Sequence, residues 1–440
     1  MLLPLKRAWL PDMSHDQDLI TYYCDRLQHD DSGVLLDECL QGHLSWREKK
    51  CINLLASEGP MSIAARTLLA GPLCSRTAAG HIGNTQRFFA GTHYIDQLEA
   101  LCHALCIQLF NCKYVEHRIL GGTQANQIVY ASLLKRGDTI ISVSPRHGGD
   151  SSAYFQSMLT TMGIKIIDMP FDQENYIDIA ALDALLHTHK PALLSIGFSL
   201  SLYPPDYKSI FTLCRHHNVL SHADCAHELG LIAGEAYPNP LMLGADVMSG
   251  STGKTLSGPQ GGILLWNNEA YTTKFLQHTF PYSVGGYQNN RIAALTLTLS
   301  ELQHFGKAYM HQAIANAQAL AQYLRDDDIV VYGTQPLTCT HQVLIDVKDN
   351  NRAYMRRLES CNLITSITNI PGVMAKNSGL RFGVMECTRM GMGTSDMKTI
   401  ASFIARALKF QEPSYDIVKE VSNFRSSFSK HAYCHHHPCP

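Results

Sequence analysis

Hydrophobic positions recur along this chain with the spacings of both helices and strands. Within residues 94–110, apolar side chains such as Ile95, Leu98, Leu101 and Leu105 return at intervals of three or four residues. Because an α-helix turns once every 3.6 residues, this spacing gathers them on one face. The pattern therefore predicts an amphipathic helix over residues 94–110.

Short apolar runs follow, and helical patterns separate them. The runs cover residues 139–143, 165–169, 192–196 and 218–222, and the helical stretches between them include residues 179–186 and 207–216. Runs of this length with apolar residues on both faces are typical of buried parallel strands. The alternation predicts an α/β domain in which helices cover both faces of a mostly parallel sheet.

After Gly286 the hydrophobic pattern changes from alternating strands and helices to long helical stretches. Helical patterns over residues 291–305 and 311–324 precede an alternating strand at 340–347 and an amphipathic helix at 396–408. These elements predict a second, smaller α+β domain. We therefore expect an N-terminal arm over residues 1–50, a large domain over 51–290 and a small C-terminal domain over 291–440.

Composition adds little beyond a broad class. The 440 residues are 45% hydrophobic and 17% charged, with a net charge of -2, as is ordinary for a soluble globular protein. This balance gives no reason to expect nucleic acid or a membrane as a partner. The beginning of the chain lacks the apolar region of a signal peptide, and the 14 cysteines lack the regular spacing of a disulfide scaffold. We expect a cytoplasmic protein with reduced thiols.

The C-terminal segment from Cys434 to Cys439 places soft metal ligands close together. Adjacent histidines in a terminal segment rarely have the outer hydrogen-bond partners that fix a specific metal site. We favour a frayed tail and assign no metal site.

Ligands bind open parallel sheets beyond the carboxyl ends of the strands, so polar residues at these positions carry the first functional signals. Gly122 and Thr123 precede a helical stretch, where free backbone N–H groups attract anions. The same residues also suit a simple turn and cap. A phosphate site here needs support from other motifs.

Asp224 follows the predicted strand at 218–222 and precedes His227. A buried carboxylate is costly without a partner. A protonated pyridine nitrogen is one such partner, and this pairing strengthens pyridoxal phosphate (PLP) as an electron sink. A helix N-cap is the structural alternative for Asp224.

Lys254 stands among hydroxyls and glycines, with Ser251 and Thr252 just before it. The segment ends like a nucleotide-binding P-loop, but Met248 occupies the position of the first glycine that this motif requires. A lysine in this setting instead suits a Schiff base beside a phosphate cradle. Arg381, in the small domain, has the fork geometry that binds a carboxylate, although surface arginines are common.

Taken in order, these motifs resemble serine hydroxymethyltransferases, which are fold-type-I PLP enzymes, from about Leu54 to Leu408. The resemblance implies a fold-type-I PLP-dependent transferase whose mostly parallel large domain carries the cofactor. It also implies a small amino-acid substrate and a homodimer, or a dimer of dimers. Gly285 and Gly286 resemble the turn that reaches a neighbouring subunit's phosphate.

The resemblance assigns a role to each matching residue. The catalytic residues are Lys254, Asp224, His147, His227 and Glu58. The cofactor-binding residues are Gly122, Thr123, His147, Ser199, Asp224, His227, Ser251, Thr252, Lys254, Gly285 and Gly286. Ser57 and Arg381 bind the substrate, with Arg381 on its carboxylate. His147 is expected to stack on the cofactor ring, and Glu58 is the acid candidate that remains.

Several positions depart from the family pattern. Ala79 stands near the place of the family's catalytic glutamate, and the other departures are Thr77, Phe89, Asp150, Gly253, Gln260 and two residues inserted between Gly80 and Arg87. The changes remove proton-handling groups near the substrate's β-carbon, so use of tetrahydrofolate is left open.

Three functions remain open. The first is a hydroxymethyltransferase-like enzyme that cleaves or forms the Cα–Cβ bond of a serine, threonine or α-methylserine type of substrate. The second is a folate-independent threonine aldolase or transaldolase. The third is a catalytically idle PLP-binding protein.

Overall fold

The computed structural model describes residues 14–83, 86–154, 157–286, 288–372, 378–410 and 414–435. His436, His437 and Cys439 of the C-terminal tail lie outside these residues. Cys434 is buried and the His435 ring packs 5.3 Å from those of His304 and Phe305, so the expectation of a frayed tail is wrong for these two residues. Among the residues described, no helix is long and apolar enough to cross a membrane.

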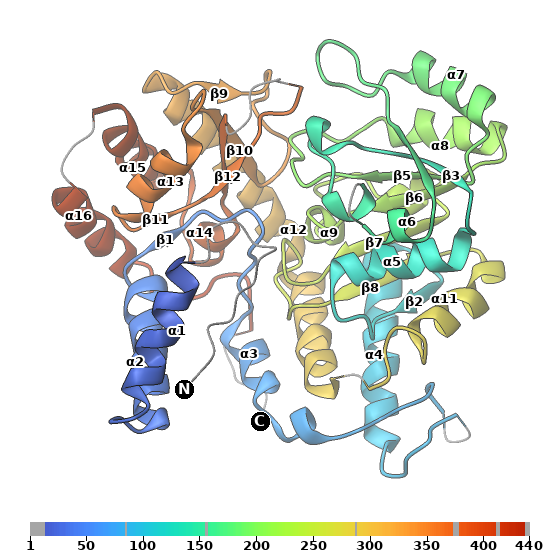
Figure 1. Ribbon diagram of the computed structural model, residues 1–440, viewed down its shortest axis with the longest axis horizontal. Helices are drawn as coiled ribbons and strands as arrows, with labels where there is room; N and C mark the ends of the chain where they lie inside the picture. The colour runs from blue at the N-terminus through green and yellow to red at the C-terminus, as the bar shows by residue number, and fades with distance from the viewer. Residues whose placement is uncertain are drawn as a thin grey trace.

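The large domain is built around a seven-stranded sheet with the order β2-β8-β7-β6-β5-β3-β4 (Figure 1). Its strands are β2 (Tyr114–Glu116), β3 (Thr139–Ser142), β4 (Lys165–Asp168), β5 (Leu193–Gly197), β6 (Leu220–Asp224), β7 (Val247–Ser251) and β8 (Gly262–Trp266). β8 runs antiparallel to both of its neighbours, and the other pairs are parallel. The α/β prediction is confirmed. β6 lies two residues later than predicted and therefore ends on Asp224.

Helices cover both faces of this sheet because its strands are apolar on both faces. Ile140 and Leu193 pack in a core with α5 (Gly122–Leu133) and α11 (Thr272–Thr279). The next residues along the same strands, Ile141 and Leu194, belong to the core on the other face. Successive side chains in a strand point to opposite faces, so each strand contributes to two cores.

The second core packs against a further set of helices. They include α4 (His93–Phe110), α7 (Ile179–His189), α8 (Tyr207–His216), α9 (Leu229–Ala233) and α10 (Pro240–Leu243). The helices predicted at 94–110, 179–186 and 207–216 therefore agree with the structure within a few residues.

One long helix, α12 (Asn289–Asp326), replaces the two helices predicted at 291–305 and 311–324. That part of the prediction was wrong, because a glycine inside a helix costs only about 1 kcal/mol when packing supports it. Gly306 lies in the middle of α12 against Gly234, where an added Cβ at Gly234 would come within 2.5 Å of the Gly306 carbonyl oxygen. The close approach of the two backbones explains why the helix continues.

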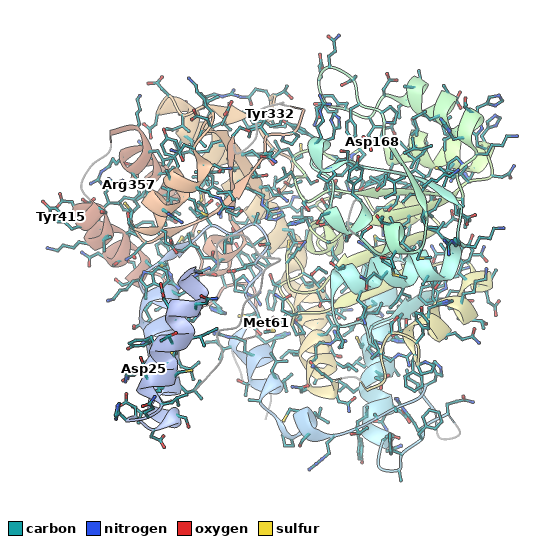
Figure 2. The ribbon with its side chains drawn as sticks, viewed as in Figure 1. Asp25, Met61, Asp168, Tyr332, Arg357 and Tyr415 are labelled. Atoms are coloured by element: carbon teal, nitrogen blue, oxygen red, sulfur yellow. The ribbon has the colours of Figure 1, made fainter. Side chains whose placement is uncertain are left out.

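The C-terminal part of the chain forms a four-stranded antiparallel sheet of order β12-β13-β10-β9. Its strands are β9 (Val331–Tyr332), β10 (Gln342–Asp346), β12 (Ser366–Thr368) and β13 (Gly379–Gly383), and the helices nearby are α13 (Asn351–Glu359), α14 (Met385–Arg389), α15 (Thr394–Ala405) and α16 (Ser414–Ser426). Figure 2 shows Tyr332 at the border with the large domain and Tyr415 on the outer side of α16.

The N-terminal segment runs along the small domain. It holds α1 (Ser14–Arg26), α2 (Ser32–His43) and β1 (Ile52–Asn53), and β1 pairs in parallel with β11 (Leu363–Ile364). α3 (Ile63–Leu69) then packs against α12. The segment just after residue 50 thus serves both domains, and the exact domain boundaries stay a prediction.

Candidate active site

Lys254 lies in the loop after β7, in a partly buried position. Burial lowers the pKa of its ammonium, although Asp224 and Asp150 raise it in part. The predicted entrance segment packs directly on this loop: the Gly59 N–H donates to the Gly253 carbonyl at 3.2 Å, and a Cβ at Gly59 would lie 1.6 Å from the Lys254 carbonyl oxygen. A lysine with a lowered pKa has a larger neutral fraction, which is the nucleophilic form.

Asp224 ends β6 and is partly buried. One carboxylate oxygen accepts from Asn126 Nδ2 at 2.6 Å, and the other accepts from the Ala226 N–H at 3.0 Å. Burial, with a further contribution from Asp150, raises the pKa of Asp224 to about 6. Near neutral pH it is a carboxylate in need of a cationic partner.

Asp150 is a second carboxylate near Lys254, and the sequence analysis noted it only as a departure. It accepts from the Ser152 N–H at 2.7 Å and from Ser199 Oγ at 3.0 Å. Although burial opposes it, these hydrogen bonds and Lys254 leave the pKa of Asp150 lowered. No motif signalled this role, because Asp150 and Ser199 follow different strands.

The phosphate-binding residues predicted at the start of α5 lie beside the end of β7. A Cβ at Gly122 would lie 3.2 Å from Ser251 Cβ, and the cap residue Gly121 has no side-chain cap. The first N–H groups of this helix, including that of Thr123, therefore need a ligand or solvent. Thr252 lies deeper, and its hydroxyl donates to the Pro259 carbonyl.

Arg381, on β13, reaches the large domain across the domain border. One guanidinium nitrogen donates to the Ser199 carbonyl at 2.7 Å, whereas its buried Nε has no hydrogen-bond partner among the described residues. Burial lowers its pKa to about 10, so it remains a cation at neutral pH. An unpaired buried donor on a charged group suits an anionic ligand.

Two of the predicted histidines border this cluster. His147 stacks on Phe171 with ring centroids 4.2 Å apart and hydrogen-bonds Asn175 Oδ1 at 2.6 Å, so only its other face is open to a cofactor ring. His227 is buried, stacks on His341 at 5.9 Å, and its Nδ1 has no partner among the described residues. Burial and the nearby Lys254 hold its pKa well below the usual value.

The entrance segment places Ser57 and Glu58 half-buried near Lys254. The Glu58 carboxylate accepts from Arg47 at 3.0 Å and from Asn53 at 2.7 Å. Both hydrogen bonds hold the carboxylate in place beside the entrance segment. Its role as the acid stays a prediction.

Gly285, Gly286 and Ala79 lie away from these contacts. Both glycines are exposed, with no atom within 4 Å of an added Cβ. Ala79 is buried, and its carbonyl accepts from the Phe88 N–H at 3.2 Å. A contact of either glycine with phosphate therefore needs a second subunit, as the resemblance implies.

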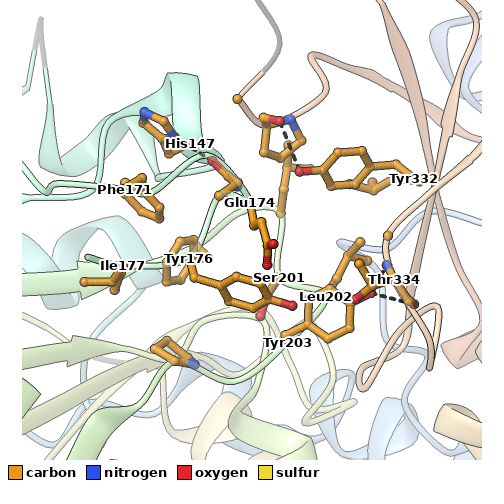
Figure 3. Close-up of a pocket in the computed structure, with 18 of the residues that line it drawn as sticks. His147, Phe171, Glu174, Tyr176, Ile177, Ser201, Leu202, Tyr203, Tyr332 and Thr334 are labelled. Atoms are coloured by element: carbon orange, nitrogen blue, oxygen red, sulfur yellow. Dashed lines mark hydrogen bonds between the residues drawn. The ribbon is translucent and has the colours of Figure 1, made fainter. Parts of the chain in front are cut away.

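A cavity of about 520 Å³ lies between the two domains, with His147 on its wall (Figure 3). Its lining includes the aromatic side chains Tyr176, Tyr203 and Tyr332, with Glu174 among them. The cavity provides room for a small molecule next to the stacking histidine.

The fold and the site define a class. The strand order of the large sheet is that of the fold-type-I PLP-dependent transferases. The site adds a lysine and a carboxylate at the ends of two adjacent strands and an arginine from the second domain. Together these features define the protein as a member of that class. The residues fit the cofactor. The start of α5 offers N–H groups to the phosphate, and Lys254 is a poorly solvated amine. The Asp224 carboxylate could pair with the protonated ring nitrogen.

The chain belongs to the serine hydroxymethyltransferase family. The family model for serine hydroxymethyltransferase matches residues 31–404. The enzyme of that name from Pyrobaculum aerophilum is 36% identical over 91% of this chain and 94% of its own, and that from Thermococcus onnurineus is 33% identical over 92% and 96%. The crystal structure of L-threonine transaldolase from Pseudomonas fluorescens shares the fold, with a TM-score of 0.85 at 22% identity over 96% of both chains. The protein is thus a PLP-dependent enzyme for Cα–Cβ bond chemistry of hydroxy amino acids.

The sequence analysis missed Glu228, which directly follows His227. It is buried, and neither carboxylate oxygen has a hydrogen-bond partner among the residues described. Burial raises its pKa from 4.5 to about 8. Glu228 is therefore mostly protonated at neutral pH.

This shift predicts a pH-dependent effect of Glu228→Gln on stability. In the unfolded chain Glu228 ionises above pH 4.5, whereas in the folded protein it stays protonated until about pH 8. The wild type therefore loses folding stability as the pH rises through this window. Glutamine removes that loss, and the variant should gain more stability at pH 8 than at pH 5. Urea unfolding of both cofactor-free proteins at the two pH values measures it, and an equal difference at both would contradict the shift.

Proposed function

We propose that the substrate is a threonine-like β-hydroxy amino acid and that its Cα–Cβ bond is cleaved or formed without tetrahydrofolate. The observation that carries this proposal is Ala79, which stands where the resembled enzymes have a catalytic glutamate. Gly253 and Asp150 likewise stand in place of histidines. Glu58 remains as an acid, but Arg47 and Asn53 already hold its carboxylate.

The retained residues suffice for the first stages of the reaction. Arg381 binds the substrate carboxylate with the donors that it leaves unpaired. Asp224 holds a proton on the ring nitrogen of PLP, which supplies the electron sink for charge that develops at Cα. Lys254 would hold the cofactor through its amine, which could also accept or return a proton.

A substrate panel tests the branch. We expect cleavage of threonine to outpace tetrahydrofolate-dependent cleavage of serine, because a missing acid–base group typically costs about 10²- to 10⁴-fold in rate. Rates with serine, threonine and α-methylserine, each with and without tetrahydrofolate, measure this on one preparation. Fast serine cleavage that strictly requires tetrahydrofolate would contradict the proposal and favour the hydroxymethyltransferase.

The variant Ala79→Glu is the matched control, because it restores the carboxylate at this position. It should raise tetrahydrofolate-dependent serine cleavage and leave threonine cleavage nearly unchanged. No gain with serine would show that Ala79 is not what limits folate use.

An idle PLP-binding protein is the second candidate. Retention of Lys254, Asp224 and Arg381 in one cluster argues against it, because binding alone does not require a carboxylate grip. Adding glycine to the holoenzyme separates the two, since only a competent site should produce a new long-wavelength absorption band.

We also propose a cytoplasmic homodimer, or a dimer of dimers. Gly285 and Gly286 are exposed, and so are the large side chains of Tyr282, Phe88 and Phe89, at 71%, 73% and 49%. Exposed apolar side chains of this size are typical of a surface that another subunit covers. Sedimentation of the holoenzyme gives the assembly mass directly.

A further inference from the structure

A continuous chain of hydrogen bonds runs through the large domain and ends on Asp224. The links are Tyr130 Oη to Ser195 Oγ (3.3 Å), Ser195 Oγ to His222 Nδ1 (2.9 Å), His222 Nε2 to Ser249 Oγ (2.8 Å), Ser249 Oγ to Asn126 Oδ1 (2.6 Å) and Asn126 Nδ2 to Asp224 Oδ2 (2.6 Å). None of these side chains before Asp224 is more than 2% exposed. We call this series the buried relay.

The hydrogens of the relay can be placed from the end at Asp224. Asn126 Nδ2 donates to the carboxylate and, at 3.1 Å, to Ser152 Oγ, so its Oδ1 must accept. Ser249 gives its only hydrogen to that oxygen. Toward His222 the Ser249 hydroxyl therefore accepts, and His222 must carry its proton on Nε2.

The remaining links follow the same direction. Burial lowers the pKa of His222 to about 3, so the ring is neutral and its Nδ1 is a bare acceptor. Ser195 donates to this nitrogen and accepts from Tyr130. Every hydroxyl in the relay thus donates once in one direction, an arrangement in which hydrogen bonds strengthen one another.

The relay decides which side of the Asn126 amide faces Asp224. If the amide turned over, its carbonyl oxygen would face the carboxylate at 2.6 Å, and two acceptors would repel. Ser249 prevents the amide from turning over only while its oxygen accepts the His222 Nε2–H hydrogen bond, because its own hydrogen must then point to Asn126. An apolar residue at 222 would leave that oxygen free to accept from a turned amide.

We propose that His222 is a positioning residue for the cofactor: through Ser249 it holds Asn126 as a donor to Asp224, and so keeps Asp224 a carboxylate able to pair with the ring nitrogen. This inference rests on the proposed function of the site, since Asp224 meets a ring nitrogen only when PLP is bound. It assigns a role to a buried histidine that touches neither cofactor nor substrate.

The test compares PLP binding by cofactor-free His222→Leu, Ser249→Ala and the double variant with the wild type. Each single variant should weaken PLP binding by about 10- to 100-fold, the range typical of residues that orient a ligand's direct partners. Because both substitutions interrupt the same relay, the affinity of the double variant for PLP should equal that of the single variant that binds PLP less tightly. His222→Gln, whose amide offers a donor and an acceptor, should recover most of the affinity.

Controls separate positioning from general loss of stability. Leu265→Ala removes core volume on the face of the sheet opposite to Ser195, His222 and Ser249, so it should lower the melting temperature and leave PLP affinity unchanged. In addition, ¹⁵N NMR of histidine-labelled apoprotein should show a neutral Nε2–H tautomer signal that His222→Gln removes.

The outcomes are distinguishable. Wild-type protein that fails to bind PLP would overturn the proposed function itself. Normal PLP affinity in His222→Leu, additive losses in the double variant, or an Nδ1–H tautomer would each overturn the role of His222 while leaving the PLP site intact.

Discussion

Replacing Lys254 with alanine should abolish the absorption band of the lysine-linked cofactor and reduce turnover to background. That absorption arises when the lysine amine replaces the carbonyl oxygen of PLP, with release of water. Lys254 is an amine whose environment suits this reaction, because burial lowers its pKa although Asp224 and Asp150 raise it in part. An absorption spectrum of the purified variant, mixed with PLP, measures the effect.

The matched control is Lys165→Ala, which removes an exposed lysine on β4. It should leave both the spectrum and the rate unchanged. Lys254→Ala should still bind PLP without the covalent link, because the α5 N-terminus and Asp224 remain. A wild-type spectrum in Lys254→Ala would show that another amine holds the cofactor.

Replacing Arg381 with alanine should weaken amino-acid binding far more than PLP binding. Breaking one side of a buried ion pair typically costs about 3 to 5 kcal/mol, a factor of about 10² to 4 × 10³ in affinity. Arg381 fits this expectation because it is largely enclosed and its Nε has no partner among the described residues. Titration of the holoenzyme with threonine, followed by absorbance, gives the dissociation constant.

Arg381→Lys keeps the positive charge but loses the planar fork, so it should recover only part of the affinity. This comparison separates the charge from the two parallel hydrogen bonds. Unchanged threonine affinity in Arg381→Ala would place the carboxylate grip elsewhere, and an equal loss of PLP affinity would indicate a role in folding the site.

The residues that we propose to hold the cofactor could be selected from the sequence because their chemistry is local. Lys254 among hydroxyls and glycines, and Gly122 and Thr123 before a helix, carry their signals within a few positions. Parallel strands bring such segments to one edge of the sheet, so the order of the motifs sufficed to predict the fold type and the cofactor.

The residues that support these groups could not be found in this way. Asn126, His222 and Ser249 lie on α5, β6 and β7, and their hydrogen bonds join positions 27 and 123 residues apart. In the sequence each is an ordinary residue of a buried segment. Likewise, no pattern in the sequence indicated that Arg47 and Asn53 donate hydrogen bonds to the Glu58 carboxylate.

What the sequence by itself determined was the class of fold and the cofactor, because hydrophobic periodicity and short motifs depend on neighbours along the chain. The tertiary structure alone decided the continuity of α12 through Gly306, the pairing of Asp150 with Ser199, and the direction of the buried relay. These depend on contacts between distant segments, where packing and the need to satisfy every buried polar group override local preference.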